Sequence, residues 1–220
     1  MFLIIRKTWQ EILEAVFPTT PLVRQILALD ASKLASIIPP ADVINEKNYL
    51  AIISYKHPLA RTAIWEMKYR GHRGITRKMT QIIYDFLIAE LSEAATWQNF
   101  SNPIIIPIPI TKQKLAERGF NQTIRLAEGL KKLDKNTNFI IDTTCLIKVK
   151  NTESQSHTHN RTQRLKNLEG SFEVTKKESI AGRNIILLDD VITTGATMKE
   201  AKKTLKEAGI KKVICLSLAH

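Results

Sequence analysis

Residues Asn184–Met198 read NIILLDDVITTGATM, and this stretch decides the fold. The run Ile185–Leu188 is apolar without a break, which predicts a strand buried on both faces. We expect a helix at 197–208, ended by Gly209. An apolar strand that leads directly into a helix is typical of α/β proteins, whose central parallel sheet is flanked by helices. The stretch therefore predicts that fold class.

Asp189, Asp190 and the loop after them carry the predicted chemistry. The two acids stand where the strand ends, at the edge where such sheets bind ligands. Loop residues 193–197, TTGAT, are small enough for backbone N–H groups to approach an anion, and the following helix adds its positive end. Carboxylates accept hydrogen bonds from the vicinal hydroxyls of a ribose. These features predict a pocket for a ribose 5-phosphate group.

A plainer interpretation of the same residues is a Thr-capped helix that follows a strand with two solvated acids. Neighbouring strand residues point to opposite faces, so Asp189 and Asp190 reach one ligand only if the strand has already turned into the loop. Two other phosphate-binding motifs are excluded, because no Gly-Lys-Ser/Thr follows the glycine and G-x-G-x-x-G is absent.

The rest of the chain divides into a helical extension, residues 1–45, and an α/β domain, residues 46–220. In the extension, Thr8 and Glu11 form a capping box, and the helices look separate from the α/β domain. Residues 150–170 are polar and too long for an ordinary connection, which indicates either a lid or a disordered segment. In the domain we expect strands at 49–55, 104–110, 145–149, 171–174 and 213–218, and helices at 57–68, 78–95 and 121–133.

The composition points to a cytoplasmic, anion-attracting protein. The chain has 220 residues and a formal net charge of +12, which attracts nucleic acid or phosphorylated metabolites, although a generically basic surface is an equal alternative. Cys145 and Cys215 lie in apolar runs and are expected to be buried free thiols, without the spacing of a zinc or redox pair. No apolar run is long enough to span a membrane.

IILLDDVITTGAT closely resembles the 5-phosphoribosyl-1-pyrophosphate (PRPP) signature of type I phosphoribosyltransferases. The resemblance implies their fold, a central parallel sheet with a small hood, and Mg²⁺ brought to the site by PRPP. It also implies that Asp189 and Asp190 hold the ribose hydroxyls and that residues 193–197 cradle the 5-phosphate. The catalytic candidates are Asp190, Arg161 and Arg164. The PRPP-binding set is Asp189, Asp190, Val191, Thr193, Thr194, Gly195, Ala196 and Thr197.

Two further segments resemble the competence protein F (ComF) family, which is associated with DNA uptake. They are residues 55–74, YKHPLARTAIWEMKYRGHRG, and 107–122, PIPITKQKLAERGFNQ. Spaced residues extend the likeness, namely Gln155, Arg164, Asn167 and Phe172. Many members carry a zinc-binding cysteine cluster after Phe-Pro, but here Thr-Thr-Pro follows Phe17-Pro18, so we expect no zinc. The resemblance therefore implies a member without the zinc module.

Within these segments, the resemblance implies that Pro107, Ile108 and Pro109 form a pyrophosphate loop. The alternative is an edge or irregular strand, because proline removes ladder donors. The most family-specific piece is the set Arg118, Gly119, Phe120, Asn121 and Gln122. The Arg118 guanidinium is suited to bidentate contacts with a phosphate. A solvated arginine that precedes a helix capped by Asn121 is an equal interpretation.

A second function is implied by the same resemblance, namely a weakly catalytic or non-catalytic protein that binds single-stranded DNA together with other competence proteins. Trp65 and Tyr69, four residues apart, could stack on bases, although such a pair more often packs into the core. His157 and His159 are better explained as a solvated pair than as metal ligands. Basic residues that could follow the phosphates of a strand are Lys56, Arg61, Lys68, Arg70, His72, Arg73 and Arg77.

Overall fold

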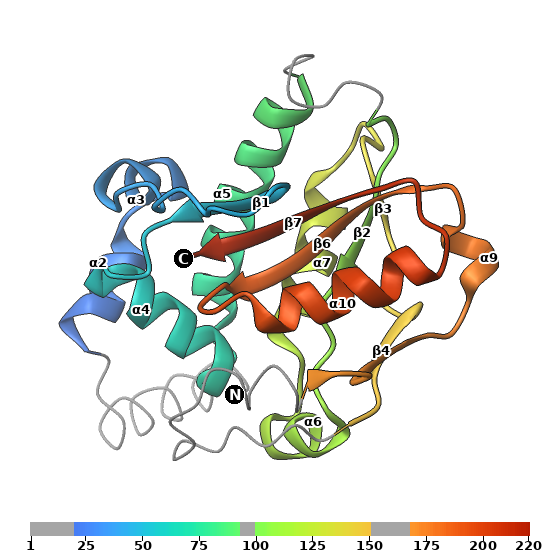
Figure 1. Cartoon of the computed structure of the whole chain (residues 1–220). Helices are drawn as coiled ribbons and strands as arrows, with labels where there is room; N and C mark the ends of the chain where they lie inside the picture. The colour runs from blue at the N-terminus through green and yellow to red at the C-terminus, as the bar shows by residue number, and fades with distance from the viewer. Residues whose placement is uncertain (1–19, 93–99, 151–167) are drawn as a thin grey trace, which may run out of the picture.

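A computed structural model describes residues 20–92, 100–150 and 168–220. Its centre is a five-stranded parallel sheet in the order β1-β7-β6-β2-β3 (Figure 1). The predicted central parallel sheet is therefore confirmed. The capping box Thr8–Glu11, the histidine pair and the candidates Arg161 and Arg164 lie outside the described residues. The strands are β1 (Tyr49–Ile53), β2 (Ile104–Pro107), β3 (Ile140–Ile141), β6 (Asn184–Val191) and β7 (Lys212–Ala219).

Strand β6 is central because its apolar side chains are buried on both faces of the sheet. Ile185, Ile186, Leu187 and Leu188 are fully buried, and the strand pairs with β2 on one side and β7 on the other. Alternate side chains enter two different cores, so Ile186 and Leu188 face one while Ile185 and Leu187 face the other. This alternation shows which face of the sheet each β6 side chain occupies, from Ile185 to the residue before Asp189.

Helices cover both faces of the sheet (Figure 1). The core around Ile186 and Leu188 contains residues of α4 (Pro58–Trp65), α5 (Arg73–Ser92) and α7 (Gln122–Leu133). The core around Ile185 and Leu187 contains Met198, Ala201 and Leu205 of α10 (Ala196–Glu207). None of the helices in the described ranges is long and apolar enough to cross a membrane.

The N-terminal helices α2 (Pro21–Ala28) and α3 (Ala31–Ile37) form as expected. The Thr20 hydroxyl accepts from the N–H of Val23 at 3.3 Å to cap α2, and Asp30 caps α3. The view that they are separate is wrong, because Val23, Ile26 and Leu34 are fully buried in the same core as α4 and α5. Residues 20–38 therefore pack as part of the α/β body.

Other elements differ from the sequence-based expectation. Strands β4 (Leu146–Lys148) and β5 (Phe172–Val174) pair antiparallel in a sheet of their own, outside the parallel one. Helix α5 begins at Arg73, five residues early, because His72 accepts at its N-terminus from the Ile75 amide. The expected helix at 57–68 continues as a π-helical turn, η1 (Glu66–Arg70). Two short helices were not expected, α6 (Lys112–Arg118) and α9 (Lys177–Ile180).

Candidate phosphate and ribose site

The loop between β6 and α10 is shaped to hold an anion. Gly195 has φ 72°, a left-handed conformation that glycine adopts without strain, and it occupies the N-cap position of α10. The first helical hydrogen bond runs from the Lys199 N–H to the Gly195 carbonyl at 2.8 Å, so the amides of 196–198 precede the helical ladder. Thr193 and Thr194 are exposed. These amides and the helix dipole suit a phosphate.

Asp189 shares a cavity with this loop. The cavity, of about 40 Å³, is lined by Asp189, Val191 and residues 192–198. The carboxylate Oδ1 of Asp189 accepts the backbone N–H of Asp190 at 2.8 Å, which fixes the side chain close to its own strand end. An acceptor thus lies beside an anion nest, which is the juxtaposition that a ribose 5-phosphate requires.

Asp190 lies on the opposite face of the strand. Strand β6 continues through Val191, so the chain has not turned between the two acids, and Asp190 follows Ile186 and Leu188 in the alternation. Its side chain is 3% exposed and its Oδ1 pairs with Lys68 Nζ at 3.0 Å. Its Oδ2 has no hydrogen-bond partner among the described residues. The expected turn into the loop before Asp190 is therefore absent, and the two carboxylates flank the end of β6 from opposite faces, so that one ligand touches both only if it lies across that end.

The charges of the site are strongly coupled. Burial, followed by the negative charge of Asp190, raises the pKa of Asp189 to about 7, with Lys68 acting in the opposite direction. Burial and then the positive charge of Lys114 lower the pKa of Lys148 to about 8. Burial, then Arg118, then Lys68 lower the pKa of Lys114. Several cations thus crowd around two acids, an arrangement that an incoming polyphosphate would relieve.

The predicted pyrophosphate loop lies next to Asp189. Pro107 is in register with Leu188, and the N–H of Ile108 donates to the Leu188 carbonyl at 2.8 Å. The alternative of an edge strand is wrong, because β2 lies between β6 and β3 with the prolines at its end. The Ile108 carbonyl accepts from Asn121 Nδ2 at 3.1 Å and from Thr123 Oγ1 at 2.7 Å. The loop is therefore held rigidly at the sheet edge.

The segment 118–122 connects this loop to η1. Gly119 ends α6 in the left-handed conformation, and Asn121 caps α7 as expected. The Arg118 guanidinium lies 5.0 Å from the centroid of the Tyr69 ring and donates to Gln122 Oε1 at 3.4 Å. The interpretation of Arg118 as a freely solvated side chain is therefore wrong. Segment 118–122 therefore links α6, α7 and η1 beside the site.

Some residues of the site were missed from the sequence. Lys148 interacts with the charge of Asp189, and Lys114 with the charges of Lys148 and Lys68, yet only the fold brings α6 and β4 to the end of β6. A lysine at the end of a predicted strand, as Lys148 is, was the one signal available. Trp65 and Tyr69 were expected in the core, but they are 48% and 57% exposed and stack on each other at 5.5 Å. Tyr69 lies within the π turn, which breaks the α-helical periodicity used for the expectation, whereas Trp65 is exposed at the end of α4 before the turn.

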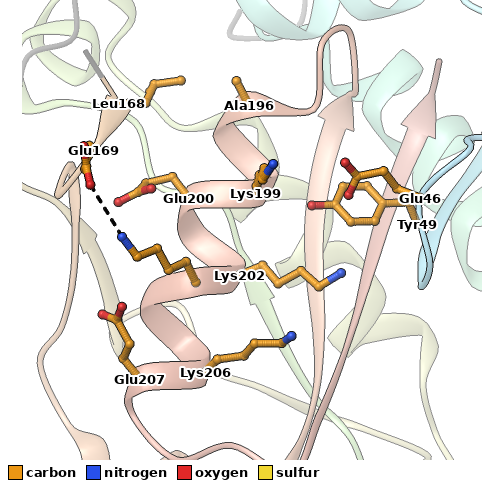
Figure 2. Close-up of a pocket in the computed structure, with 11 residues that line it drawn as sticks. Glu46, Tyr49, Leu168, Glu169, Ala196, Lys199, Glu200, Lys202, Lys206 and Glu207 are labelled. Carbon is orange, nitrogen blue, oxygen red and sulfur yellow. Dashed lines mark ion pairs between the residues drawn. The ribbon is translucent and has the colours of Figure 1, made fainter. Parts of the chain in front are cut away.

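A larger cavity, of about 660 Å³, runs along the outer face of α10 (Figure 2). Its charged lining has four lysines and four glutamates, so it has no net attraction for an anion. Glu169 and Lys203 pair across it at 3.7 Å. It shares only Ala196 with the small loop cavity. Of the two cavities, the loop cavity is therefore the better candidate for a phosphate.

Comparisons with known proteins agree with this geometry. A family model described as the phosphoribosyl transferase domain matches residues 116–220. Competence protein F of Haemophilus influenzae is 30% identical over 169 residues, covering 76% of this chain and 69% of that protein. Competence protein ComFC of Bacillus subtilis is 42% identical over 106 residues, covering 48% of this chain but only 39% of that protein.

A solved hypoxanthine phosphoribosyltransferase from Staphylococcus aureus superposes with a TM-score of 0.35 at 15% identity, over 64% of this chain and 62% of that one. A score this low adds nothing, so the assignment rests on the sheet, the loop and the family match. Together they define the class, an α/β protein with the type I phosphoribosyltransferase fold. Within that class the chain belongs to the competence protein F (ComF) family. The resemblance inferred from segments 55–74 and 107–122 is confirmed.

Proposed function

We propose that this chain binds PRPP at the end of β6. The 5-phosphate lies on the amides of 196–198, the ribose lies across the end of β6 with one hydroxyl on Asp189 and the other on Asp190 at the opposite face, and the pyrophosphate lies against loop 107–109. One observation carries the proposal, namely that Asp189 lines the same small cavity as the anion nest. The family match to a phosphoribosyl transferase domain supports it.

The arrangement suits displacement at ribose C1. A bond forms from the acceptor to C1 while the bond from C1 to the pyrophosphate oxygen breaks, and the pyrophosphate leaves with the electron pair. Lys114 and Lys148 are placed to neutralise the charge that grows on this leaving group. Loop 107–109 holds it rigidly, because Asn121 and Thr123 fix its carbonyl.

Mg²⁺ fits this site as a companion of PRPP. The ion is commonly held by one or two carboxylates and by substrate phosphates, and the Oδ2 of Asp190 lacks a partner in the described structure. When bound, the ion would supply charge neutralisation on the pyrophosphate. We include no zinc, because the cysteines Cys145 and Cys215 are buried free thiols in apolar surroundings. Two reduced cysteines also support our proposal of a cytoplasmic location.

Two substitutions of Gly195 test the binding proposal. Aspartate and asparagine both tolerate a left-handed conformation, and a Cβ at this position meets nothing closer than 3.9 Å. We expect Gly195→Asn to keep PRPP affinity within a few-fold, whereas Gly195→Asp places a carboxylate in the anion nest. Calorimetry with Mg²⁺ present should show roughly a hundredfold or greater loss for the aspartate alone, or about 3 kcal/mol. Equal affinities in the two variants would contradict the proposal.

Catalysis is tested separately by pyrophosphate release from PRPP with a panel of nucleobases and amines. We expect release that Asp189→Asn abolishes and Asp85→Asn, an exposed acid on α5, leaves intact. Binding without release for every acceptor would leave the PRPP site standing and reject the transferase activity.

A second candidate function, binding of single-stranded DNA, is favoured by the exposed aromatic pair. The Arg70 guanidinium lies 5.2 Å from the Trp65 ring centroid, and Arg118 lies in the same way over Tyr69. Aromatic rings with flanking cations are a general means of holding unpaired bases. The names of the relatives, competence proteins, support a role with DNA.

The aromatic pair can be tested independently of the PRPP site. We expect Trp65→Ala with Tyr69→Ala to weaken binding of a labelled single strand at least tenfold, since each stacked base contributes about 1–3 kcal/mol. Asp189→Asn should leave this affinity unchanged. Fluorescence anisotropy at several salt concentrations measures both. Unchanged binding in the aromatic double variant would reject this surface.

A further inference from the structure

The π-helical turn η1 holds Lys68 between the buried Met67 and the exposed Tyr69. Tyr69 is exposed, but the side chain of Lys68 is only 24% exposed and reaches inward to Asp190. The turn is braced by the ion pair between Arg70 and the buried Glu66 at 3.4 Å, and by a hydrogen bond from the His72 N–H to the Glu66 carbonyl. Single π turns inside helices frequently mark functional sites.

Lys68 forms an ion pair with Asp190, a carboxylate that the proposed ligand also uses. Asp190 is almost fully buried, and a buried carboxylate without a counter-charge is strongly destabilising. Burial is the largest single influence and lowers the pKa of Lys68, but the charge of Asp190, its hydrogen bond and the charge of Asp189 together outweigh burial and raise that pKa. Lys68 is therefore held as an ammonium against Asp190 in the ligand-free protein. Ribose hydroxyls that approach Asp190 meet the lysine ammonium already in place.

Once displaced, the ammonium cannot remain among like charges. The charge of Lys68 lowers the pKa of Lys114, so the two ammonium groups lie close enough to repel each other. An anion is required to receive it, and a pyrophosphate beside loop 107–109 is the group that the proposed ligand brings. The flexible four-carbon stem of lysine allows this movement.

We propose that Lys68 exchanges partners, pairing with Asp190 in the free protein and with the pyrophosphate of PRPP when ribose hydroxyls take its place on Asp190. This rests on the proposed PRPP site. Ribose 5-phosphate, which lacks the pyrophosphate, displaces the lysine without offering it a new partner. PRPP does both, so Lys68 makes the site discriminate between the two ligands.

Lys68→Gln tests the exchange, because the amide still donates a hydrogen bond to Asp190 but carries no charge for pyrophosphate. We expect calorimetry with Mg²⁺ to show PRPP affinity reduced at least tenfold and ribose 5-phosphate affinity unchanged or increased, because the ion pair that this ligand must break is gone. The ratio of the two affinities therefore falls. Lys132→Gln, an exposed lysine on α7, is the matched control and should change neither.

A purely structural role for Lys68 would weaken both ligands by the same factor, and that result would overturn the inference. So would an unchanged affinity for PRPP. If Lys68→Gln does not fold, Lys68→Gln with Asp190→Asn replaces the ion pair by a neutral hydrogen bond, and the ratio must still fall. A wild-type protein that binds neither ligand would reject the proposed PRPP site itself.

Discussion

Asp189 is the residue whose ionisation links the fold to the ligand. Its pKa, ordinarily near 4, is raised to about 7 by burial and by Asp190. A raised carboxyl pKa means that the protonated form favours the folded state, so this contribution is complete below about pH 4 and is lost as the pH rises through 7. A ligand that uses the charged form works against that preference.

We therefore expect Asp189→Asn to stabilise the ligand-free protein at pH 8 and to have little effect at pH 4. The melting temperature should rise by roughly 2–4 °C for each kcal/mol recovered, as measured by thermal scans at both pH values. Asp85→Asn, on the exposed face of α5, should show no such pH dependence. A variant less stable than wild type at pH 8 would contradict the assigned burial of charge.

At the scale of elements, the junction between η1 and segment 118–122 holds the site together. Gly71 ends η1 with φ 60°, and a Cβ there would lie 2.4 Å from an Arg125 nitrogen and 2.9 Å from the Phe120 ring. That arginine donates to the Gly71 carbonyl at 3.2 Å and lies 3.6 Å from the centroid of the Phe120 ring. The packing of Arg125 and Phe120 against Gly71 leaves no room for a side chain at position 71.

Gly71→Ala should consequently destabilise the fold by about 2–4 kcal/mol, the sum of left-handed strain and a displaced arginine. Gly182→Ala is the control, since it has φ 67° but open space at the Cβ position, and it should lose only the strain of about 1–2 kcal/mol. Urea denaturation measures both. Equal losses of unfolding free energy in the two variants would show that the contacts of Gly71 at the junction do not contribute to stability.

How far these elements could be predicted depended on the length of their patterns. The apolar run 185–188, the small-residue loop and the following helix were predictable, because each has a strong local signature. The 7-residue α6 was not, because it buries no side chain and so has no apolar periodicity, and the π turn was not, because it departs from the α-helical period. The position of Asp190 was missed for a related reason, namely that strand β6 runs one residue beyond it.

At the scale of the whole molecule, the site is assembled from segments far apart in the chain. Lys68, Lys114, Lys148 and Asp189 come from four different elements, and only the strand order brings them together. A sequence pattern within one segment could identify the acids, but it could not pair them with these lysines. The net charge of +12 indicated an anionic partner without locating it.

The N-terminal helices α2 and α3 are part of the same folded body as the sheet and its helices. Ile26 is fully buried in the core shared with α4 and α5, whereas Leu27 beside it is 36% exposed. Ile26→Ala should cost about 2–5 kcal/mol of global stability, and Leu27→Ala less than about 1 kcal/mol. One cooperative transition with a lower midpoint is expected in chemical denaturation. A separate early transition would instead show that the helices unfold on their own.

The most direct test of the proposed site is a crystal structure of the protein with ribose 5-phosphate and Mg²⁺. We predict the phosphate within hydrogen-bonding distance of the backbone amides between Gly195 and Met198, and a ribose hydroxyl on the carboxylate of Asp189. A phosphate bound elsewhere, such as along the outer face of α10, or a ribose that does not touch Asp189, would contradict it.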